Sequence, residues 1–318
     1  MKYKNIVALI ILIICVMVIG CTKTDNKVVT VRLAYIPYAA DLPFFVAMEN
    51  DMFTKRGITV EPIKCANSSE ALDLVLSGKA DGSMGNSFSV VFSIHARDPQ
   101  MLKLINVSAE TKDQDRYTGF ILISSESDIT SPEELFGKTI GTGKGASQLL
   151  WAQLYFGKLG WNTKTDITIE QEATDALLGA LKSGQFDALI VFEPYATIAI
   201  KSNIGKPLVP FFRQSIIDPF PAGGATLSRE FCKKHPKISN TVEEVLDQAI
   251  ELINTNPKKA KESLLKYTPL GEDEALNSQI YYWWSSKEIK QKPIEELVEI
   301  LYNHDLLDFK IDIPSLLE

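Results

Sequence analysis

The chain has 318 residues, of which 45% are apolar and 23% are charged, and its formal net charge at pH 7 is −7. These are ordinary values for a globular protein, and the length is too great for one small core, so we expect two lobes. The sequence has no basic run and no alternation of aromatic with basic residues, which argues against nucleic acid as a partner.

The N-terminus has the pattern of a secretory signal. Lysines at positions 2 and 4 precede an almost unbroken apolar run over residues 6–19. A basic head followed by such a run is typical of a signal segment, and the run is shorter than the roughly 20 residues that a membrane span needs. We therefore expect residues 1–20 to be a signal peptide.

Cys21 lies directly after this segment. The sequence Val18-Ile19-Gly20-Cys21 resembles the bacterial lipobox, in which the cysteine is acylated and becomes the new N-terminus, although Ile19 is bulkier than the usual small residue. We expect lipidation at Cys21, a polar tether over residues 21–27, and an extracytoplasmic folded part that is lipid-anchored to the cell membrane. The alternative is an uncleaved anchor in which Cys21 is an ordinary residue.

Two cysteines are left unmodified by this processing. Loss of the signal would remove 20 of the 318 residues and leave 298, and the loss of its two lysines would change the formal charge from −7 to −9. In the mature chain, Cys65 and Cys232 are expected to be buried free thiols. A disulfide between them is the alternative, because exported proteins form such bonds.

Strands and helices alternate through the first two thirds of the mature chain. The assignment follows β-branched alternation for strands, and Pro or Ser at the first helical positions for helices. Alternation of this kind implies parallel-type sheets with helices on both faces, an α/β fold. The predicted strands are 28–35, 58–63, 81–85, 117–124, 138–141, 165–170 and 186–191, and the predicted helices are 43–50, 69–76, 146–158 and 174–182, with a helical turn at 131–134.

The last third has helical spacing of apolar residues instead. We expect helices over 241–254, 256–267, 272–284 and 293–302.

One unit of the chain occurs twice. Ser77-Gly78-Lys79-Ala80-Asp81 and Ser183-Gly184-Gln185-Phe186-Asp187 each follow a predicted helix and precede a predicted strand, at an offset of 106 residues. At that offset Leu33 corresponds to Thr139, inside predicted strands. A shared order of helix, glycine cap and strand indicates a repeated α/β unit.

Enzyme signatures are missing from the sequence. It contains no H-E-x-x-H, no G-x-S-x-G and no Walker lysine loop, and Gly141-x-Gly143-x-Gly145 fails the dinucleotide spacing. The three histidines stand alone, without a metal-ligand partner at local spacing. We therefore expect a binding protein without catalytic residues, metal or cofactor.

Several segments together point to a known family. They are 42–47 (LPFFVA), 57–61 (GITVE), 77–81 (SGKAD), 187–196 (DALIVFEPYA) and 256–260 (NPKKA). With these segments the chain resembles the substrate-binding lipoproteins of ABC importers in the aliphatic-sulfonate, taurine and nitrate group, whose fold is shared by proteins that bind thiamine-pyrimidine precursors. The resemblance covers the mature chain and specifies the family better than the ligand.

The resemblance implies a two-lobed, type II periplasmic-binding-protein-like fold with a ligand cleft between the lobes. Lobe one would comprise 28–116 and receive the chain again with the C-terminal helices at 216–318, while lobe two would comprise 117–215. The crossings are expected near 116–118 and 212–220. The implied partners are a small-molecule ligand, an ABC permease and its ATPase, and we expect a monomer.

Ligands of open α/β sheets bind beyond the carboxyl ends of strands, and this rule selects candidate residues. By the repeat, Glu193 corresponds to Ser87 and should face it across the cleft. The candidate ligand-binding residues are Tyr38, Asp41, Leu42, Ser68, Asn86, Ser87, Lys144, Gly145, Ala146, Ser147 and Glu193.

Two of these candidates imply opposite ligand charges. The glycine-rich turn 143–147 opens a helix, so its free N–H groups and Lys144 favour an anion; the alternative is a tight turn with a solvated lysine. Glu193 would repel an anion and accept an amine, unless it fixes the hinge. Tyr38, Phe88, Phe192 and Tyr195 either stack on a flat ligand or wall the cleft.

Three functions therefore remain open. The first is binding of a small sulfonate-like or zwitterionic ligand for a permease. The second keeps the fold and binds a thiamine-pyrimidine precursor or similar heteroaromatic, with Glu193 pairing an amine. The third is a pyrimidine-synthase-like enzyme, although the cysteine-rich motif and reactive histidine of such relatives are missing.

Overall fold

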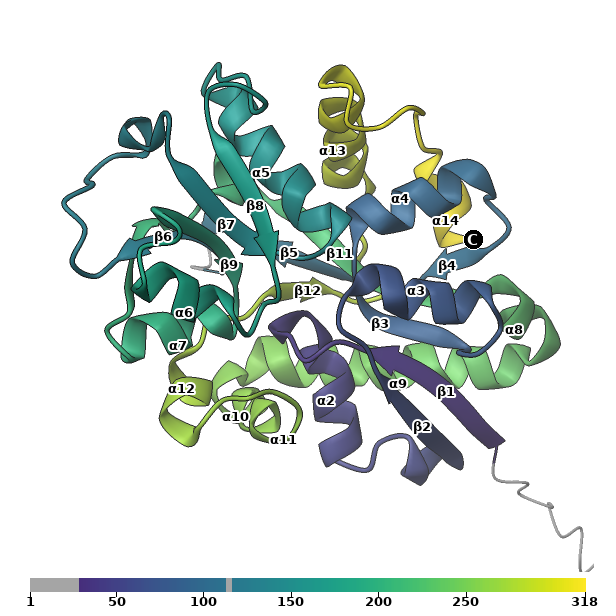
Figure 1. Cartoon of the computed structure of the whole chain (residues 1–318). Helices are drawn as coiled ribbons and strands as arrows, with labels where there is room; N and C mark the ends of the chain where they lie inside the picture. Colours follow the sequence, from purple (N-terminus) through teal and green to yellow (C-terminus); the bar gives the residue numbers. More distant parts are fainter. Residues whose placement is uncertain (1–28, 113–115) are drawn as a thin grey trace, which may run out of the picture.

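The computed structural model describes residues 29–112 and 116–318 (Figure 1). The predicted signal, the tether and Cys21 lie outside the described residues. Within the described ranges, no helix combines the length and apolarity needed to cross a membrane.

Two separate sheets organise the molecule (Figure 1). The first has the order β2-β1-β3-β11-β5-β12, with β4 also paired to β11, and the second has the order β8-β7-β9-β6-β10. We call the part around the first sheet lobe one and the part around the second lobe two. The strands are β1 (Val29–Tyr35), β2 (Ile58–Lys64), β3 (Gly82–Ser87), β4 (Leu102–Leu104), β5 (Val107–Glu110), β6 (Gly119–Ser124), β7 (Thr139–Gly143), β8 (Thr168–Glu172), β9 (Ala188–Phe192), β10 (Gly205–Val209), β11 (Phe220–Ser228) and β12 (Tyr282–Trp284).

The two sheets share one plan. In each, three parallel strands are followed by an antiparallel strand that the chain forms directly after crossing from the other lobe: β6 in lobe two and β11 in lobe one. The chain crosses between β5 and β6 and returns between β10 and β11. The carboxyl ends of the parallel strands of both sheets therefore meet between the lobes, as the ligand rule requires.

Helices cover both faces of each sheet. In lobe two, α5 lies on one face while α6 and α7 lie on the other, and β9 alternates accordingly: Ala188 and Ile190 join the core beneath α5, Leu189 and Val191 the core beneath α6. The helices are α2 (Leu42–Glu49), α3 (Ser68–Leu76), α4 (Phe88–Arg97), α5 (Ala146–Lys158), α6 (Leu177–Lys182), α7 (Tyr195–Lys201), α8 (Arg229–Lys234), α9 (Pro236–Thr255), α10 (Pro257–Ala260), α11 (Leu264–Tyr267), α12 (Glu272–Asn277), α13 (Gln291–Asn303) and α14 (Ile313–Leu317).

One apolar core continues from lobe one into lobe two. It includes Trp151 and Phe156 of α5, Phe212 of the return crossing and Phe220 of β11. Helix α4 of lobe one packs against α5 of lobe two (Figure 1). The lobes therefore share buried surface on the α4–α5 side, and the pocket described below lies beside it.

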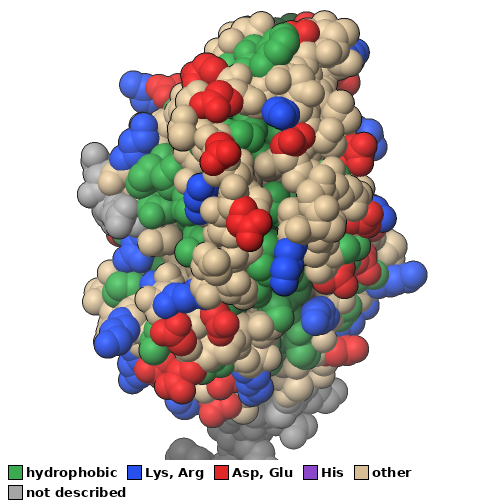
Figure 2. All heavy atoms as spheres, turned by 60° about the vertical axis from the view of Figure 1, so that its left-hand side comes forward, with side chains coloured by type: hydrophobic (Ala, Val, Ile, Leu, Met, Phe, Trp, Pro, Cys, Tyr) green, Lys and Arg blue, Asp and Glu red, His purple; other side chains and the backbone are tan. Residues whose placement is uncertain are grey.

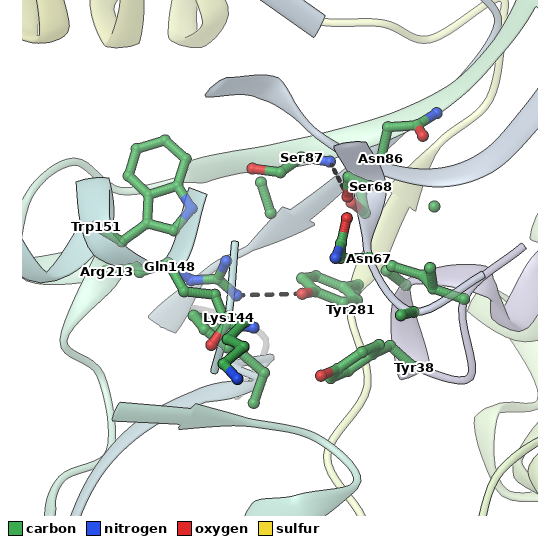
Figure 3. Close-up of a pocket in the computed structure, with 17 residues that line it drawn as sticks. Tyr38, Asn67, Ser68, Asn86, Ser87, Lys144, Gln148, Trp151, Arg213 and Tyr281 are labelled. Carbon is green, nitrogen blue, oxygen red and sulfur yellow. Dashed lines mark hydrogen bonds between the residues drawn. The ribbon is translucent and has the colours of Figure 1, made fainter. Parts of the chain in front are cut away.

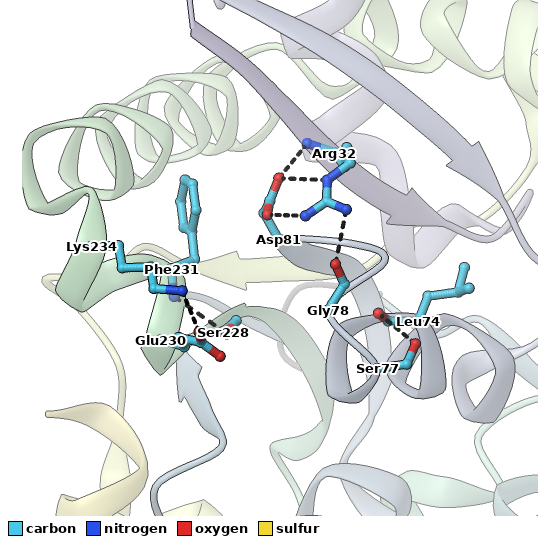
Figure 4. Close-up of polar contacts among 9 residues, drawn as sticks. All are labelled: Arg32, Leu74, Ser77, Gly78, Asp81, Ser228, Glu230, Phe231 and Lys234. Carbon is cyan, nitrogen blue, oxygen red and sulfur yellow. Dashed lines mark hydrogen bonds and ion pairs between the residues drawn. The ribbon is translucent and has the colours of Figure 1, made fainter.

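The repeated unit has the same structural role in both lobes. Gly78 and Gly184 have φ of 69° and 77°, a left-handed conformation that glycine adopts without strain, and each ends its helix. The Asp81 carboxylate then accepts a hydrogen bond from the Arg32 N–H at 2.8 Å (Figure 4), and Asp187 accepts one from the Thr139 N–H at 2.9 Å. Each aspartate thus ties the helix–strand turn to the first strand of its sheet.

The predicted alignment of these first strands is wrong by one residue. Thr139 stands where Arg32 stands, an offset of 107, whereas the helix, glycine and aspartate keep an offset of 106. The sequence alignment had placed Leu33 on Thr139. Lobe one has one residue more than lobe two between this strand position and the aspartate, and this accounts for the difference.

The C-terminal third departs most from expectation. The predicted helix 272–284 is wrong: α12 ends at Asn277, and residues 282–284 form β12, which pairs antiparallel with β5. Aromatic side chains favour strands, and burial of Trp283 and Trp284 at the sheet edge outweighs their helical spacing. The predicted helix 256–267 is divided into α10, a 3-10 turn and α11.

Candidate ligand-binding site

A pocket with about 620 Å³ of empty space lies between the lobes, at the carboxyl ends of the parallel strands (Figure 3). Residues from both lobes and from the C-terminal segment line it: Ile36, Tyr38, Ala40, Ala66, Asn67, Ser68, Gly85, Asn86, Ser87, Ser108, Lys144, Gln148, Trp151, Phe192, Arg213, Ala222 and Tyr281.

Lobe one contributes two helix starts to the pocket. Asn67 caps α3, since its side chain accepts a hydrogen bond from the Glu70 N–H at 3.0 Å. Ser87 lies at the cap position of α4, and its N–H donates to the Ser68 hydroxyl at 3.1 Å (Figure 3). This bond brings the first turns of α3 and α4 together at one wall.

Asn86 supports this wall from behind. It is 3% exposed, and its amide nitrogen donates to the Ser83 and Gly224 carbonyls and to the Thr226 hydroxyl, at 3.0 to 3.2 Å. Its amide oxygen accepts from the Ser83 hydroxyl at 2.6 Å. Because its hydrogen-bonding capacity is used within the protein, Asn86 holds β3 to β11.

Lobe two contributes the start of α5. Gly145 precedes this helix with φ of 142°, and Lys144 lines the pocket with an exposed side chain whose ammonium lies 3.6 Å from Glu172. The Gln148 side-chain oxygen accepts from the Gly143 N–H at 2.9 Å, which fixes the turn. The glycine-rich turn therefore presents a cation and a helix N-terminus to the pocket.

Arg213 lines the base of the pocket from the return crossing. Its guanidinium forms a buried ion pair with Glu110 and donates to the Thr118 hydroxyl at 3.0 Å and the Tyr281 hydroxyl at 3.2 Å (Figure 3). It also lies 4.6 Å from the centre of the Phe192 ring. Burial opposes the charge, but the Glu110 carboxylate beside it raises the pKa of Arg213, so the guanidinium stays cationic.

Tyr38 reaches across the mouth of the pocket from lobe one. Its hydroxyl donates to the Thr174 hydroxyl of lobe two at 3.2 Å, and its ring lies 5.9 Å from that of Tyr195. Burial raises the pKa of Tyr38 to about 12, so the hydroxyl stays protonated at neutral pH. The two lobes are therefore in direct contact through this side chain.

The structure separates the sequence-predicted candidates into two groups. Tyr38, Ser68, Asn86, Ser87 and Lys144 line the pocket. Asp41, Leu42, Gly145 and Glu193 do not line it, and the side chains of Ala146 and Ser147 lie outside the described part of the structure.

The prediction that Glu193 faces Ser87 across the cleft is wrong. Glu193 is 2% exposed, and its carboxylate accepts hydrogen bonds from the Thr197 N–H at 3.0 Å, the Thr197 hydroxyl at 2.8 Å and the Gln279 N–H at 3.0 Å. Burial raises its pKa to about 7. Glu193 joins lobe two to the segment before β12, the structural role that was its alternative.

The prediction that Asp41 and Leu42 contact the ligand is also wrong, because neither residue has exposed surface. The Asp41 carboxyl lies behind Gly85, where a Cβ would come within 2.1 Å of it. Neither carboxyl oxygen has a hydrogen-bond partner among the described residues, and burial raises the pKa of Asp41 well above its ordinary value. The proximity of Asp41 to the first strand had suggested a contact that the wall prevents.

Four residues that shape the pocket were not predicted. Gln148 and Trp151 follow Lys144 by about one and two helical turns, so a helical count from Lys144 would have indicated them. Arg213 and Tyr281 come from the return crossing and from the C-terminal segment. No local pattern marks these two positions, since tertiary structure alone brings them to the pocket.

No set of three or more His, Cys, Asp or Glu side chains in the described ranges is placed to hold a metal ion. Cys65 is buried, Cys232 is half-buried, and both are free thiols, so the disulfide alternative is wrong. On the face in Figure 2, acidic and basic side chains are mixed, without one extended basic patch. Within the described ranges, the interlobe pocket is the candidate ligand-binding site, because it lies at the carboxyl ends of the parallel strands.

Two lobes with matching sheets and a polar, aromatic-walled pocket between them define a periplasmic-binding-protein-like fold. The chain belongs to the NMT1-like family, whose model matches residues 24–266. This confirms the family resemblance and the fold inferred from the sequence.

Individual relatives agree with this assignment. The chain is 27% identical over 296 residues to the Bacillus subtilis (strain 168) protein named "Putative aliphatic sulfonates-binding protein", covering 87% of this chain and 82% of that one. It resembles the structure of the alkanesulfonate-binding protein SsuA from Xanthomonas axonopodis pv. citri bound to MOPS, with a TM-score of 0.70, 17% identity, and coverage of 90% and 97%. The periplasmic aliphatic sulphonate binding protein SsuA from Escherichia coli gives a TM-score of 0.71, 15% identity, and coverage of 90% and 96%.

Proposed function

We propose that this protein is the extracytoplasmic solute-binding lipoprotein of an ABC importer, and that it binds a small sulfonate-like organic anion. One observation carries the proposal. The starts of α3, α4 and α5 and the cations Lys144 and Arg213 meet at a single pocket whose described lining contains no carboxylate.

This arrangement suits an anionic group with several acceptor oxygens. The first turn of a helix leaves N–H groups without intrahelical partners, and the helix dipole adds partial positive charge there. The Ser68 and Ser87 hydroxyls provide further donors at the same wall. The names of the B. subtilis and X. axonopodis relatives support the same ligand class.

Transport would follow from closure of the lobes on the ligand. The closed form would dock on a permease that a separate ATPase drives, and the protein would act as a monomer. In this proposal, residues 28–116 and 216–318 form lobe one and residues 117–215 form lobe two.

Lipidation at Cys21 would hold the protein at the outer face of the membrane. Two acyl chains give a stable anchor, since each buried CH₂ contributes about 0.8 kcal/mol. Cys21→Ala should block lipidation and leave an uncleaved precursor or a secreted form, with ligand affinity unchanged. Metabolic labelling with a palmitate analogue tests this, and acyl labelling of the Cys21→Ala protein would contradict it.

The alternatives fit the pocket less well. An aminopyrimidine would lack the predicted partner for its amine, because Glu193 is buried and bonded to Thr197 and Gln279. An enzyme would need an activated nucleophile at the ligand, and the described lining contains no His, Asp or Glu that could activate its serine hydroxyls.

A thermal-shift screen of the mature protein tests the function directly. A bound ligand raises the unfolding midpoint by mass action, and we expect this with alkane- and arylsulfonates. The panel includes nitrate, taurine and an aminopyrimidine. A shift with the aminopyrimidine alone would replace the proposed ligand class, and turnover of it would establish an enzyme.

A further inference from the structure

The charged side chains in the described lining of the pocket have one sign. Among the described residues that line it, Lys144 and Arg213 are the charged ones, and both are cations. A ligand ammonium group inside the pocket would therefore face cations and helix N-termini rather than a carboxylate.

Four acidic groups close to the pocket are ion-paired, hydrogen-bonded or buried. Glu110 is paired with Arg213, and Glu172 lies 3.6 Å from the Lys144 ammonium. Glu193 accepts three hydrogen bonds from Thr197 and Gln279. Asp41 is sealed behind Gly85, where burial favours its protonated form. None of these four is placed to pair with a cation on the ligand.

The remaining walls are largely aromatic. Tyr38, Trp151, Phe192 and Tyr281 line the pocket, and Trp151 and Tyr38 approach it from opposite lobes (Figure 3). The hydroxyls of Tyr38 and Tyr281 are held by hydrogen bonds to Thr174 and Arg213. Rings held in this way give the pocket preformed aromatic surfaces on which a flat ligand body can stack.

We infer that the ligand is an anion with an uncharged aromatic body, an arylsulfonate-type molecule, and that this site rejects zwitterions such as taurine. The inference rests on the proposed function and narrows it, since binding of sulfonates alone leaves the body of the ligand open.

Matched pairs of ligands test whether the site rejects a cation on the ligand and prefers an aromatic ring. Taurine and 1-propanesulfonate differ by an ammonium in place of a methyl group, and calorimetric titration of the full mature chain should give taurine an affinity at least about tenfold lower. Benzenesulfonate and cyclohexanesulfonate test the ring, and we expect the flat molecule to bind about tenfold more tightly.

Two variants link these preferences to the pocket. Gln148→Glu adds a carboxylate while keeping the acceptor for the Gly143 N–H, so it should move the taurine-to-propanesulfonate ratio toward taurine by about tenfold. Tyr38→Leu should weaken benzenesulfonate more than 1-propanesulfonate. Tyr302→Leu, on the exposed face of α13, is the matched control and should change neither affinity.

The outcomes distinguish failure of this inference from failure of the proposed function. Taurine binding as tightly as 1-propanesulfonate, or cyclohexanesulfonate as tightly as benzenesulfonate, would overturn the inference while the sulfonate function stands. If no sulfonate binds, the proposed function fails and the inference falls with it. Circular dichroism of each variant confirms that the fold is intact.

Discussion

Arg213 lines the pocket and forms an ion pair with the Glu110 carboxylate. Both side chains of this ion pair are at least 96% buried, so neither charge can be solvated by water. Removing one partner would leave the other charged and unpaired in the interior, which costs far more than the net value of the pair.

We predict that Arg213→Met lowers the free energy of unfolding by about 3–5 kcal/mol. Adding Glu110→Gln removes the orphaned charge and should recover much of this loss. Urea denaturation of the two single variants and the double variant gives the coupling energy. Lys201→Met breaks the exposed pair with Asp273 and should cost less than about 1 kcal/mol. Additive effects of the two buried changes would contradict the prediction.

Glu193 predicts a pH dependence of stability. Its pKa of about 7 in the folded protein lies above its ordinary value of 4.5, so between these pH values the folded state holds a proton that the unfolded state has released. The contribution of Glu193 to the free energy of unfolding is therefore present at low pH and is lost as pH rises through about 7. This loss amounts to at most roughly 3 kcal/mol.

Glu193→Gln mimics the protonated carboxyl and should flatten this dependence. Chemical denaturation at several values between pH 5 and pH 8 measures it, and the difference between the wild type and the variant isolates the contribution of Glu193. A difference that does not grow with pH would show that the carboxylate is stabilised in its charged form by Thr197 and Gln279.

At the scale of elements, β11 determines how closely the two sides of the first sheet approach. A Cβ on Gly224 would lie 1.9 Å from the Asn106 carbonyl oxygen, which belongs to the backbone and has no rotamer to adopt. We predict that Gly224→Ala costs about 3 kcal/mol of stability. Thermal unfolding followed by circular dichroism measures the loss.

Gly179→Ala is the control for this substitution. Gly179 lies in α6, is exposed, and has no atom within 4 Å of its Cβ position. Alanine there should stabilise the protein by up to about 1 kcal/mol through helix propensity. Equal effects at positions 179 and 224 would mean that the close approach of β11 to Asn106 is not a constraint.

The elements that the sequence predicts well are those with local signals. The strand and helix around Pro43, the capping at Ser131 and the two glycine-ended helices carry their own turn and cap residues, and the structure contains each of them. β11 was not predicted, because Pro221 and two glycines weaken the strand pattern. Its place between β3 and β5 is set by tertiary pairing.

The pocket residues also divide into those that the sequence predicts and those that depend on tertiary structure. Residues at the ends of parallel strands, such as Tyr38 and Ser87, were found from topology alone. Glu193 follows a strand end too, but its side chain turns back into the protein toward Gln279. Side-chain direction at a strand end depends on partners from distant segments, so the sequence could not decide it.

For the whole molecule, the Tyr38–Thr174 hydrogen bond joins the lobes across the pocket mouth. Thr174 does not line the pocket, so it reports on closure rather than on ligand contact. We predict that Thr174→Val weakens ligand binding about fivefold, mainly through faster dissociation, because one interlobe hydrogen bond contributes about 1 kcal/mol.

Stopped-flow measurement of benzenesulfonate dissociation tests this expectation. Tyr38→Phe should have a similar effect, and the double variant should be no worse than either single variant, because both remove the same bond. Multiplicative effects of the two changes would indicate separate roles for Tyr38 and Thr174.

The insertion of lobe two within lobe one has a consequence for the order in which the chain matures. All strands of the second sheet lie between Gly119 and Val209. The first sheet is complete only after β11 (Phe220–Ser228) and β12 (Tyr282–Trp284) have been synthesised. During synthesis from the N-terminus, the later lobe can therefore complete its sheet first. Until Ser228 emerges, the facing edges of β3 and β5 stay unpaired, and such edges are open to pairing with other chains. We expect the nascent chain to be most prone to aggregation in that interval, because lobe one, whose first strands are synthesised earliest, still lacks its central strand.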